Sequence, residues 1–427
     1  MATEDLKIIQ KNHPEYVRRV GKHFKRNFIL LALDTAFFTF STALVSQDTI
    51  LPAFLNNLTD NPVLIGLIPA IFNLGYFLPQ IISAYITQTT PKRKKMIFWI
   101  AIGERLGILL IAVAAQSSDL LSPNMVIFLL FFAFTLYSST LGLIIPAYSD
   151  FTSKAVYKKR GLFYGINQAI GGVIGFSASL AAAKLLDMYA FPINFRRIFW
   201  LSFIFSFISP ILIANFVETE YPVQPEKKNI GVFSKHVWKV IKENSNLRKY
   251  VYTRQLVGLA AMGYSFFSIY ALQKFNLPAS MLGIYTMIIL LSQSLSGIIW
   301  GAIGDKHGYK WLLIFSSLIM FAQGLIALTA NRPFGFLLIA SMIGFIYSAM
   351  YILHPNLIFE IAPPEETSLY IGLSNTMIAP VIALGPILGG KIVESLGYTQ
   401  LFIAVCIAAF FAFLLATFVF VEPRKNQ

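Results

Sequence analysis

Twelve apolar stretches, each long enough to cross a membrane as a helix, place the strongest constraint on this chain. A helix rises about 1.5 Å per residue, so roughly 20 apolar residues cross the hydrocarbon core of a bilayer. The predicted spans are residues 28–54, 62–88, 96–116, 123–147, 161–187, 197–217, 250–274, 280–303, 310–330, 333–358, 367–391 and 398–421. Only 13% of the residues are charged and 39 are Phe. A soluble protein must cover its surface with polar groups, so this composition is not that of a soluble protein. The pattern predicts an all-α membrane protein with twelve transmembrane helices.

The basic residues of the loops predict how the spans are oriented. Clusters fall at 92–95, 154–160, 219–249 and 424–425, and they alternate with nearly neutral loops such as 55–61 and 275–279. Cytoplasmic loops carry such an excess of Lys and Arg. We therefore expect both termini in the cytoplasm; Arg196 and Arg197, on the opposite side, are the exception. The net charge of +14 is explained by these loops, and we expect no nucleic-acid partner.

An internal repeat predicts two related halves. Residues 66–93 align without gaps onto residues 283–310, and Gly165 aligns with Gly372 in a second match. Repeats in the same orientation are typical of two parallel-related six-helix bundles. The predicted divisions are a basic segment at 1–27, a first bundle at 28–218, a linker at 219–249, a second bundle at 250–422 and a tail at 423–427.

The loop between the eighth and ninth spans carries a family motif. Residues 301–310 read GAIGDKHGYK, and this resembles the cytoplasmic signature Gly-x-x-x-Asp-Arg-x-Gly-Arg-Lys of the major facilitator superfamily. The matching residues are Gly301, Asp305, Lys306, Gly308 and Lys310, with Lys306 in the place of Arg. The resemblance implies that Asp305 helps to close a cytoplasmic gate. The corresponding first-half stretch, 84–93, has Gln88 where the family has the acid.

Charged residues inside spans are costly, so each suggests a function or an internal partner. Asp34 lies in the first span, which lines the central cavity in the family that the chain resembles, and it is a candidate for ion coupling. Glu104 is a second candidate, although adjacent Glu104 and Arg105 should point in different directions and seek separate partners. We expect Asp48 to meet extracellular water. Arg254 could extend to the interface, which we favour, or neutralise an anionic substrate. Structural roles are the alternative for both acids.

Uncharged polar side chains at membrane depth are candidates for a solute pocket, because they can hydrogen-bond a substrate. They can equally join helices to one another. The candidates are Asn73, Gln80, Tyr137, Gln168, Tyr264, Gln293, Tyr347, Tyr351 and Asn375. Two amphipathic segments, 15–26 and 232–243, could lie on membrane lipid or be solvated linkers.

The sequence therefore predicts an alternating-access secondary transporter of a small organic solute, with coupling to protons left open. A non-transporting scaffold or receptor on the same fold, and a lipid translocator, are the alternatives. No catalytic, phosphate-binding or metal-binding motif is present, so we expect no enzyme activity, cofactor or metal. We expect a monomer in the plasma membrane, which in a bacterium is the inner membrane.

Overall fold

The computed structural model describes residues 14–90, 92–156, 160–219, 230–362 and 367–422. The helices are α2 (Pro14–Leu44), α3 (Ile50–Asn56), α4 (Pro62–Phe77), α5 (Gln80–Thr89), α6 (Lys94–Gln116), α7 (Pro123–Ala155), α8 (Arg160–Met188), α9 (Ile193–Ala214), α10 (Ile230–Glu243), α11 (Ser245–Ala260), α12 (Tyr264–Phe275), α13 (Met281–His307), α14 (Lys310–Thr329), α15 (Phe334–Ile361), α16 (Thr367–Leu396) and α17 (Tyr398–Leu414). Within these ranges, twelve helical segments are long and apolar enough to cross a membrane, which confirms the predicted number.

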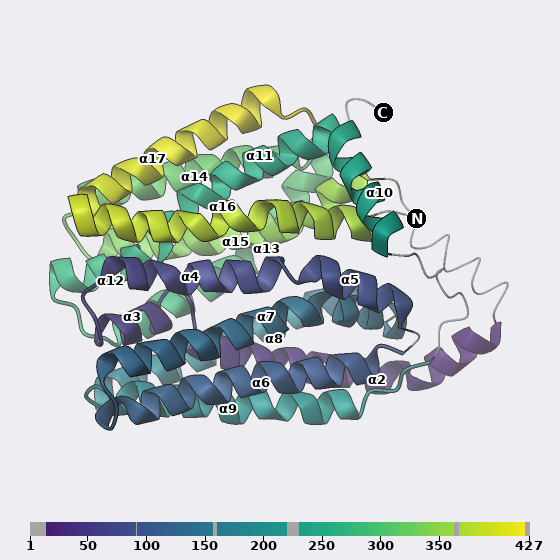
Figure 1. The fold of residues 1–427 in the computed structure, drawn as a ribbon, viewed down its shortest axis with the longest axis horizontal. Coiled ribbons are helices and arrows are strands. Elements are labelled where there is room, and N and C mark those ends of the chain that lie inside the picture. Colours follow the sequence, from purple (N-terminus) through teal and green to yellow (C-terminus); the bar gives the residue numbers. More distant parts are fainter. Residues whose placement is uncertain (1–13, 91, 157–159, 220–229, 363–366, 423–427) are drawn as a thin grey trace.

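The long helices run side by side along the long axis of the molecule (Figure 1). Helices α2 to α9, here called the first half, occupy the lower part of that view, and α11 to α17, the second half, occupy the upper part. Helices α3 and α12 lie at one end, the α3 end, whereas α10 lies across the other, the α10 end. Helices α4 and α16 lie where the two halves meet.

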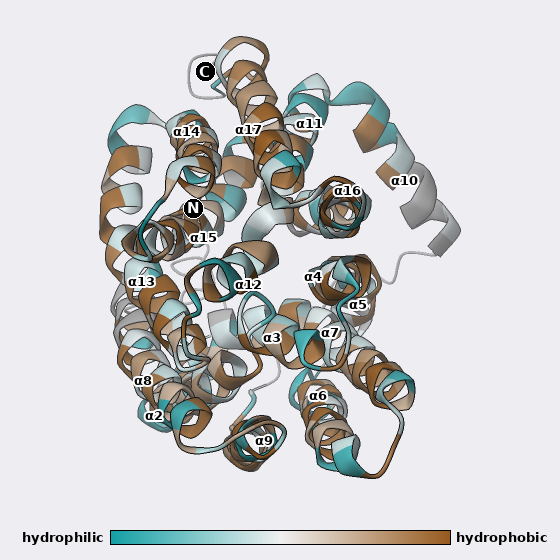
Figure 2. Cartoon of the chain, turned by 90° about the vertical axis from the view of Figure 1, so that its left-hand side faces the viewer, coloured by the Kyte–Doolittle hydropathy of each residue, from teal (hydrophilic) through white to brown (hydrophobic). Residues whose placement is uncertain are grey.

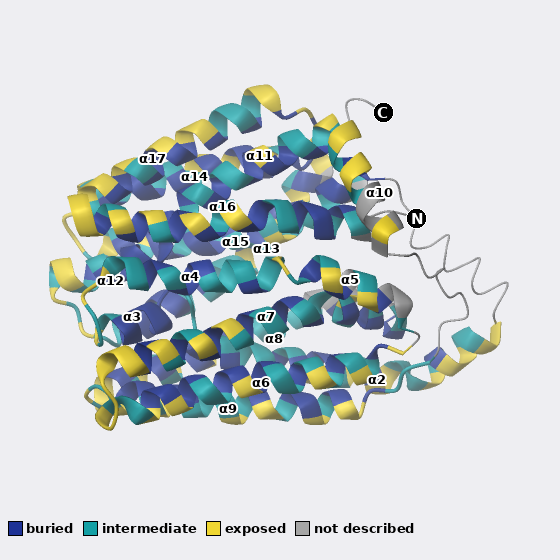
Figure 3. Cartoon of the chain, viewed as in Figure 1, coloured by how far each residue is buried: buried dark blue, intermediate teal, exposed yellow. Residues whose placement is uncertain are grey.

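The outside of the bundle is apolar. Figure 2 shows hydrophobic residues facing outward around the helices, and Figure 3 shows that many outward positions are exposed. Trp99 is 62% exposed, Phe128 64% and Ile298 79%. Large apolar side chains in such positions would be unfavourable in water and are favourable against lipid tails. The exterior is therefore a surface for the hydrocarbon core of a membrane.

The first and seventh spans are interrupted, which differs from the continuous helices that the sequence predicted. Helix α2 ends at Leu44, and α3 begins at Ile50 after a turn. Helix α11 ends at Ala260, and a 3₁₀ turn at Ala261–Gly263 separates it from α12. Extended beyond the aligned stretch, the shift of 217 residues that relates 66–93 to 283–310 places the turn at 261–263 on residues 44–46, where α2 ends, so the two breaks occur at similar places. Each break leaves backbone carbonyl groups without helical partners.

The second span bends at a proline. Helix α4 ends at Phe77 and α5 begins at Gln80, with Leu78 and Pro79 between them. Pro79 has no backbone N–H to donate, and its ring crowds the carbonyl one turn earlier. This bend separates the part of the span near the α3 end from the part near the α10 end.

Glycines allow helices of different halves to approach closely. An ideal Cβ on Gly66 of α4 would lie 2.2 Å from the backbone oxygen of Pro386 in α16. One on Gly283 of α13 would lie 2.6 Å from the backbone oxygen of Ser179 in α8. A side chain at either position would collide with the neighbouring backbone. The halves therefore pack backbone against backbone at α4–α16 and at α13–α8.

The two amphipathic segments have different structures. Residues 15–26 form the first turns of α2 and are continuous with the first span. Residues 232–243 lie in α10, where Trp238 is 69% exposed and Val240 is buried; the side chains of 232–236 lie outside the described part. The exceptional cations at the α3 end have local partners: Arg196 pairs with Asp119, and the Arg197 guanidinium lies 3.6 Å from the centre of the Tyr189 ring.

Candidate functional site

The two halves are joined at the α3 end by hydrogen bonds on the broken spans. The Tyr347 hydroxyl of α15 donates to Asp48 Oδ2 at 2.7 Å. The hydroxyl groups of Ser265 and Ser268, from α12, donate to the backbone oxygens of Gln47 and Asp48, each at 3.2 Å. Two backbone carbonyl groups in the break of the first span are therefore satisfied by side chains of the second half. We call these residues, together with Thr49 and Thr286, the α3-end contact.

The sequence suggested that Asp48 meets extracellular water. In the structure this residue is buried, with only 7% of its surface exposed. A cavity of about 10 Å³ lies beside it, lined also by Tyr264, Ile343 and other residues of α12, α13 and α15. That volume is roughly that of one water molecule. The Tyr264 ring lies 5.8 Å from the Tyr347 ring, and its hydroxyl is buried without a hydrogen-bond partner. A proton acceptor and an unpaired phenol thus line the same small cavity.

A second polar bridge joins the halves nearer the α10 end. Asn375 Nδ2 in α16 donates to Gln80 Oε1 in α5 at 3.0 Å, and both side chains are buried. Gln80 Nε2 in turn donates to the backbone oxygen of Tyr76 at 2.9 Å. Asn375 Oδ1 is buried without a partner. The bridge therefore has one acceptor left over that a hydroxyl or amide group of a solute could use.

The remaining predicted pocket residues do not gather in one place. Tyr137 packs inside the first half, where an ideal Cβ on Gly107 of α6 would meet its backbone, and Phe134 stacks on its ring at 5.7 Å. Asn73 and Gln293 are half-buried on α4 and α13, whereas Tyr351 of α15 is 67% exposed. The side chain of Gln168 lies outside the described residues.

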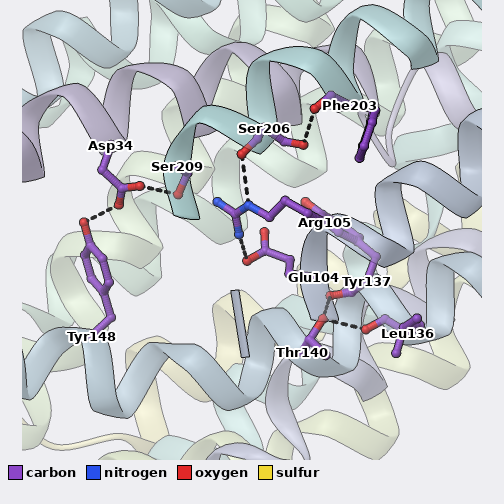
Figure 4. Close-up of polar contacts among 10 residues, drawn as sticks. All are labelled: Asp34, Glu104, Arg105, Leu136, Tyr137, Thr140, Tyr148, Phe203, Ser206 and Ser209. Atoms are coloured by element: carbon purple, nitrogen blue, oxygen red, sulfur yellow. Dashed lines mark hydrogen bonds and ion pairs between the residues drawn. The ribbon is translucent and has the colours of Figure 1, made fainter. Parts of the chain in front are cut away.

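The two candidate coupling acids belong to a buried network inside the first half (Figure 4). Asp34 accepts hydrogen bonds from Tyr148, at 2.7 Å, and from Ser209. Glu104 and Arg105 form an ion pair with each other, so the expectation that they seek separate partners is wrong. The long arginine side chain turns back to its neighbour, which sequence spacing does not reveal.

Arg105 holds this network against the sixth span. Its Nε donates to the backbone oxygen of Ser206 in α9 at 3.1 Å, and its guanidinium lies 5.8 Å from the centre of the Phe38 ring. It also interacts electrostatically with Asp34. Glu104 is thus ion-paired with the guanidinium, while Asp34 is influenced by its charge without a direct bond, and these contacts are the kind that the structural alternative requires.

The loop after α13 is fixed by an acid from the end of the chain. Gly308 has a φ of 92°, a left-handed conformation that favours glycine. The Glu422 carboxylate lies against it and accepts from the backbone N–H of Lys310 at 2.9 Å. Lys310 Nζ donates to the backbone oxygen of Thr417 at 2.8 Å. Negative charge is favourable at the start of a helix, so Glu422 caps α14.

Gly301 and Lys306, two other residues of the motif, are not closely packed. An ideal Cβ on Gly301 would meet nothing within 4 Å, so this glycine is not needed for close helix packing. Lys306 is exposed, and the side chain of Asp305 lies outside the described residues.

The first half has an equivalent cap. Glu218 accepts from the backbone N–H groups of Arg93, at 2.7 Å, and Lys94, at 2.8 Å, where α6 begins. Asp150 binds both Arg93 Nε and Lys154 Nζ at 2.7 Å. Burial lowers the pKa of Lys154, which lies beyond the end of its span, while the bond to Asp150 opposes that shift. Glu218 and Asp150 thus hold the start of α6, which follows the helix that contains Gln88.

Sequence reasoning missed the two serines of α12 and both capping glutamates. Ser265 and Ser268 are ordinary residues in an apolar span, and only their position opposite the break in the first span gives them a role. Glu218 and Glu422 could have been found as the acids that follow the sixth and twelfth spans.

Fold and site together define a polytopic membrane protein of two repeated halves that meet in polar contacts. The family model of the Major Facilitator Superfamily matches residues 31–272 and 256–427. The chain belongs to the Major Facilitator Superfamily.

Curated relatives match only part of the chain. The multidrug resistance protein MdtG of Dickeya zeae (strain Ech586) is 28% identical over 144 residues, which are 33% of this chain and 34% of the relative. The protein of the same name from Salmonella choleraesuis (strain SC-B67) is 28% identical over 145 residues, 34% of this chain and 35% of the relative. The matched segment thus spans about a third of the length of these relatives.

Solved structures match the whole fold at low identity. The nucleoside transporter NupG has a TM-score of 0.69 at 16% identity, covering 93% of this chain and 99% of that one. The D-xylose-proton symporter also has a TM-score of 0.69, at 13% identity, covering 93% and 98%. A bacterial homologue of the iron transporter ferroportin in the inward-facing state has 0.67, at 13% identity, covering 92% and 98%. At such identities the likeness establishes the fold.

Proposed function

We propose that this protein is an alternating-access secondary transporter that moves a small organic solute through a site between its two halves. The α3-end contact is the observation that carries the proposal. It consists of hydrogen bonds that cross from one half to the other, formed on spans that break at similar places. Polar bonds of this kind can be exchanged for water as the halves separate. A permanent interface would be expected to use apolar packing instead.

The proposed orientation places the α10 end in the cytoplasm, where the basic loops lie, and the α3 end outside the plasma membrane. The α3-end contact is then the closed outer gate, and the halves rock as units about the solute. Asp305, on the cytoplasmic side, contributes to the opposite gate. We propose that the transporter works as a monomer.

Proton coupling is proposed through the buried network of Asp34, Glu104 and Arg105. Two carboxyl groups around one guanidinium leave one acid without a cation, and that acid can exchange a proton as the halves move. The matched segment of the curated relatives named for multidrug resistance supports export of organic molecules as one direction to test.

A disulfide across the α3-end contact tests the proposal. The hydroxyl groups of Thr49 and Thr286 lie 2.5 Å apart and belong to different halves. The Thr49→Cys/Thr286→Cys pair, in a Cys406→Ser background, should form a disulfide that abolishes solute movement in proteoliposomes. Reduction should restore it. The assay would use labelled sugars, nucleosides, amino acids, organic anions and lipophilic cations.

A matched pair inside one half provides the control. The hydroxyl groups of Ser41 and Ser202 lie 2.8 Å apart, and both belong to the first half. A Ser41→Cys/Ser202→Cys disulfide should leave transport intact, because it joins residues that move together. Transport that survives the Thr49–Thr286 disulfide would contradict the rocking of the halves. A protein that moves no solute of any class would favour a scaffold.

A further inference from the structure

Arg254, in the α11 part of the seventh span, is a buried cation without an acidic partner in the described part of the chain. It is 9% exposed, so it does not extend to the interface as the sequence suggested. The other buried arginines of the described ranges have such partners: Arg93 binds Asp150, and Arg105 binds Glu104. An uncompensated charge in a low-dielectric site is costly, and a protein keeps one where a counter-ion is supplied by something else.

Tyr250 and His354 form a hydrogen-bond chain with this guanidinium, and the chain adds a further N–H donor to those of Arg254. Arg254 Nη1 donates to the Tyr250 hydroxyl at 3.0 Å. A phenol has a single proton, so Tyr250 then donates it to His354 Nδ1, which lies 2.6 Å away on α15. This assigns the histidine proton to Nε2, an enclosed atom without a hydrogen-bond partner. The Arg254 cluster (Arg254, Tyr250 and His354) thus offers unmatched N–H donors and no unmatched acceptor.

The charge of Arg254 is felt by aromatic residues of the other half. Arg254 interacts electrostatically with Tyr76 of α4, and Tyr76 interacts in the same way with the 67% exposed Tyr351 of α15. The rings of Phe72 and Tyr76 stack at 5.6 Å with an interplanar angle of 7°, and Phe77 packs edge-on against Tyr76 at 4.9 Å. The positive charge of Arg254 therefore acts on the aromatic rings of α4, which belong to the other half.

We propose that the Arg254 cluster binds the carboxylate of an organic anion whose aromatic or apolar body contacts Tyr76 and Tyr351. The inference rests on the proposed transport function and names the substrate class for it. A planar guanidinium binds a carboxylate through two parallel N–H groups, which gives geometric selection as well as charge. The site selects against organic cations, because Arg254 would repel them.

Three probes with one ring system test the charge selection. Indole-3-acetate, indole-3-acetamide and tryptamine carry negative, zero and positive charge on nearly the same skeleton. The purified full chain should gain thermal stability with the acetate, and much less or none with the amide and the amine. Equal stabilisation by all three, or stabilisation by tryptamine alone, would overturn the proposal. The proposal would also be overturned if no member of a wider set of aromatic and aliphatic carboxylates raised the thermal stability of the wild-type protein.

Variants of Arg254 separate binding from structure. Arg254→Gln should weaken the binding of indole-3-acetate about ten- to hundredfold, which is the effect of losing a charged hydrogen-bond partner. It should also raise the melting temperature of the ligand-free protein, because it removes an uncompensated buried charge. A purely structural arginine would give the opposite shift. Arg254→Lys should keep the preference for the acetate with lower affinity, which tests the idea even if the Gln variant folds poorly.

Arg248→Gln is the matched control, since it removes a guanidinium from the same helix, where Arg248 binds backbone oxygens of α10. It should leave acetate affinity unchanged. If Arg254→Gln binds indole-3-acetate as tightly as the wild type does, the proposed site is refuted. If the Thr49–Thr286 disulfide still blocks transport of another solute, the transporter proposal stands and the anion site alone fails.

Discussion

Removing one hydroxyl group from Tyr347 should open the α3 end of the protein. The Tyr347→Phe variant loses the 2.7 Å hydrogen bond to Asp48 Oδ2, which crosses between the halves. A hydrogen bond to a charged group contributes about 1.5–3 kcal/mol, and about 1.4 kcal/mol changes an equilibrium tenfold. The ratio of open to closed α3 ends should therefore rise about ten- to hundredfold.

Cysteine accessibility measures this ratio without a known substrate. Ile343 lines the cavity beside Asp48 and is 3% exposed. In a Cys406→Ser background, Ile343→Cys should react with a membrane-impermeant maleimide only when the α3 end opens. While opening is rare and reversible, the rate of labelling follows the open fraction. Tyr347→Phe should raise that rate by the same ten- to hundredfold.

The first half contains a matched control. Tyr148 donates to Asp34 Oδ2 at 2.7 Å, the same distance, but both residues belong to one half. Tyr148→Phe should lower the melting temperature without changing the labelling rate of Ile343→Cys. An equal increase in both variants would mean that labelling reports general loosening. No increase with Tyr347→Phe would refute the role of the α3-end contact as a gate.

Two further predictions concern stability. Arg105→Gln leaves Asp34 and Glu104 without a cation and should destabilise the protein by about 3–5 kcal/mol, seen as a lower melting temperature in detergent; an unchanged melting temperature would show that the guanidinium does not compensate these acids. Gly283→Ala should be poorly tolerated, because its Cβ would lie 2.6 Å from the backbone of α8, whereas Gly301→Ala should be neutral or slightly stabilising, since nothing lies within 4 Å. Similar melting temperatures for the two alanine variants would contradict the close packing of α13 on α8.

The number and order of spans could be predicted because hydropathy is local and each span is long. The breaks at Asp48 and at Ala261–Gly263 could not, since the turns contain enough apolar neighbours to keep a hydropathy average high. A break in a span is tolerated where protein, and not lipid, satisfies the freed backbone groups. Here the hydroxyl groups that do so, from Ser265 and Ser268, come from the other half, more than 200 residues away.

Side-chain partners were the least predictable part of the site. Adjacent Glu104 and Arg105 leave their helix in different directions, yet the flexible arginine reaches back to its neighbour. Arg254 could have extended to the interface by its length alone, and only its contact with Tyr250 shows that it turns inward. Long side chains choose among partners that several helices bring together, and those choices depend on tertiary packing.

The serine bonds of the α3-end contact have a consequence for how this protein varies among organisms. Their acceptors are the main-chain oxygens of Gln47 and Asp48, which every amino acid supplies. Substitution at residue 47 therefore leaves the acceptor in place, whereas residue 265 needs a hydroxyl group. In a family alignment, the column of residue 265 should therefore keep a hydroxyl-bearing residue, whereas this bond places no constraint on the column of residue 47. Methods that infer spatial proximity from paired substitutions should consequently overlook these two bonds, although they join the halves of the molecule.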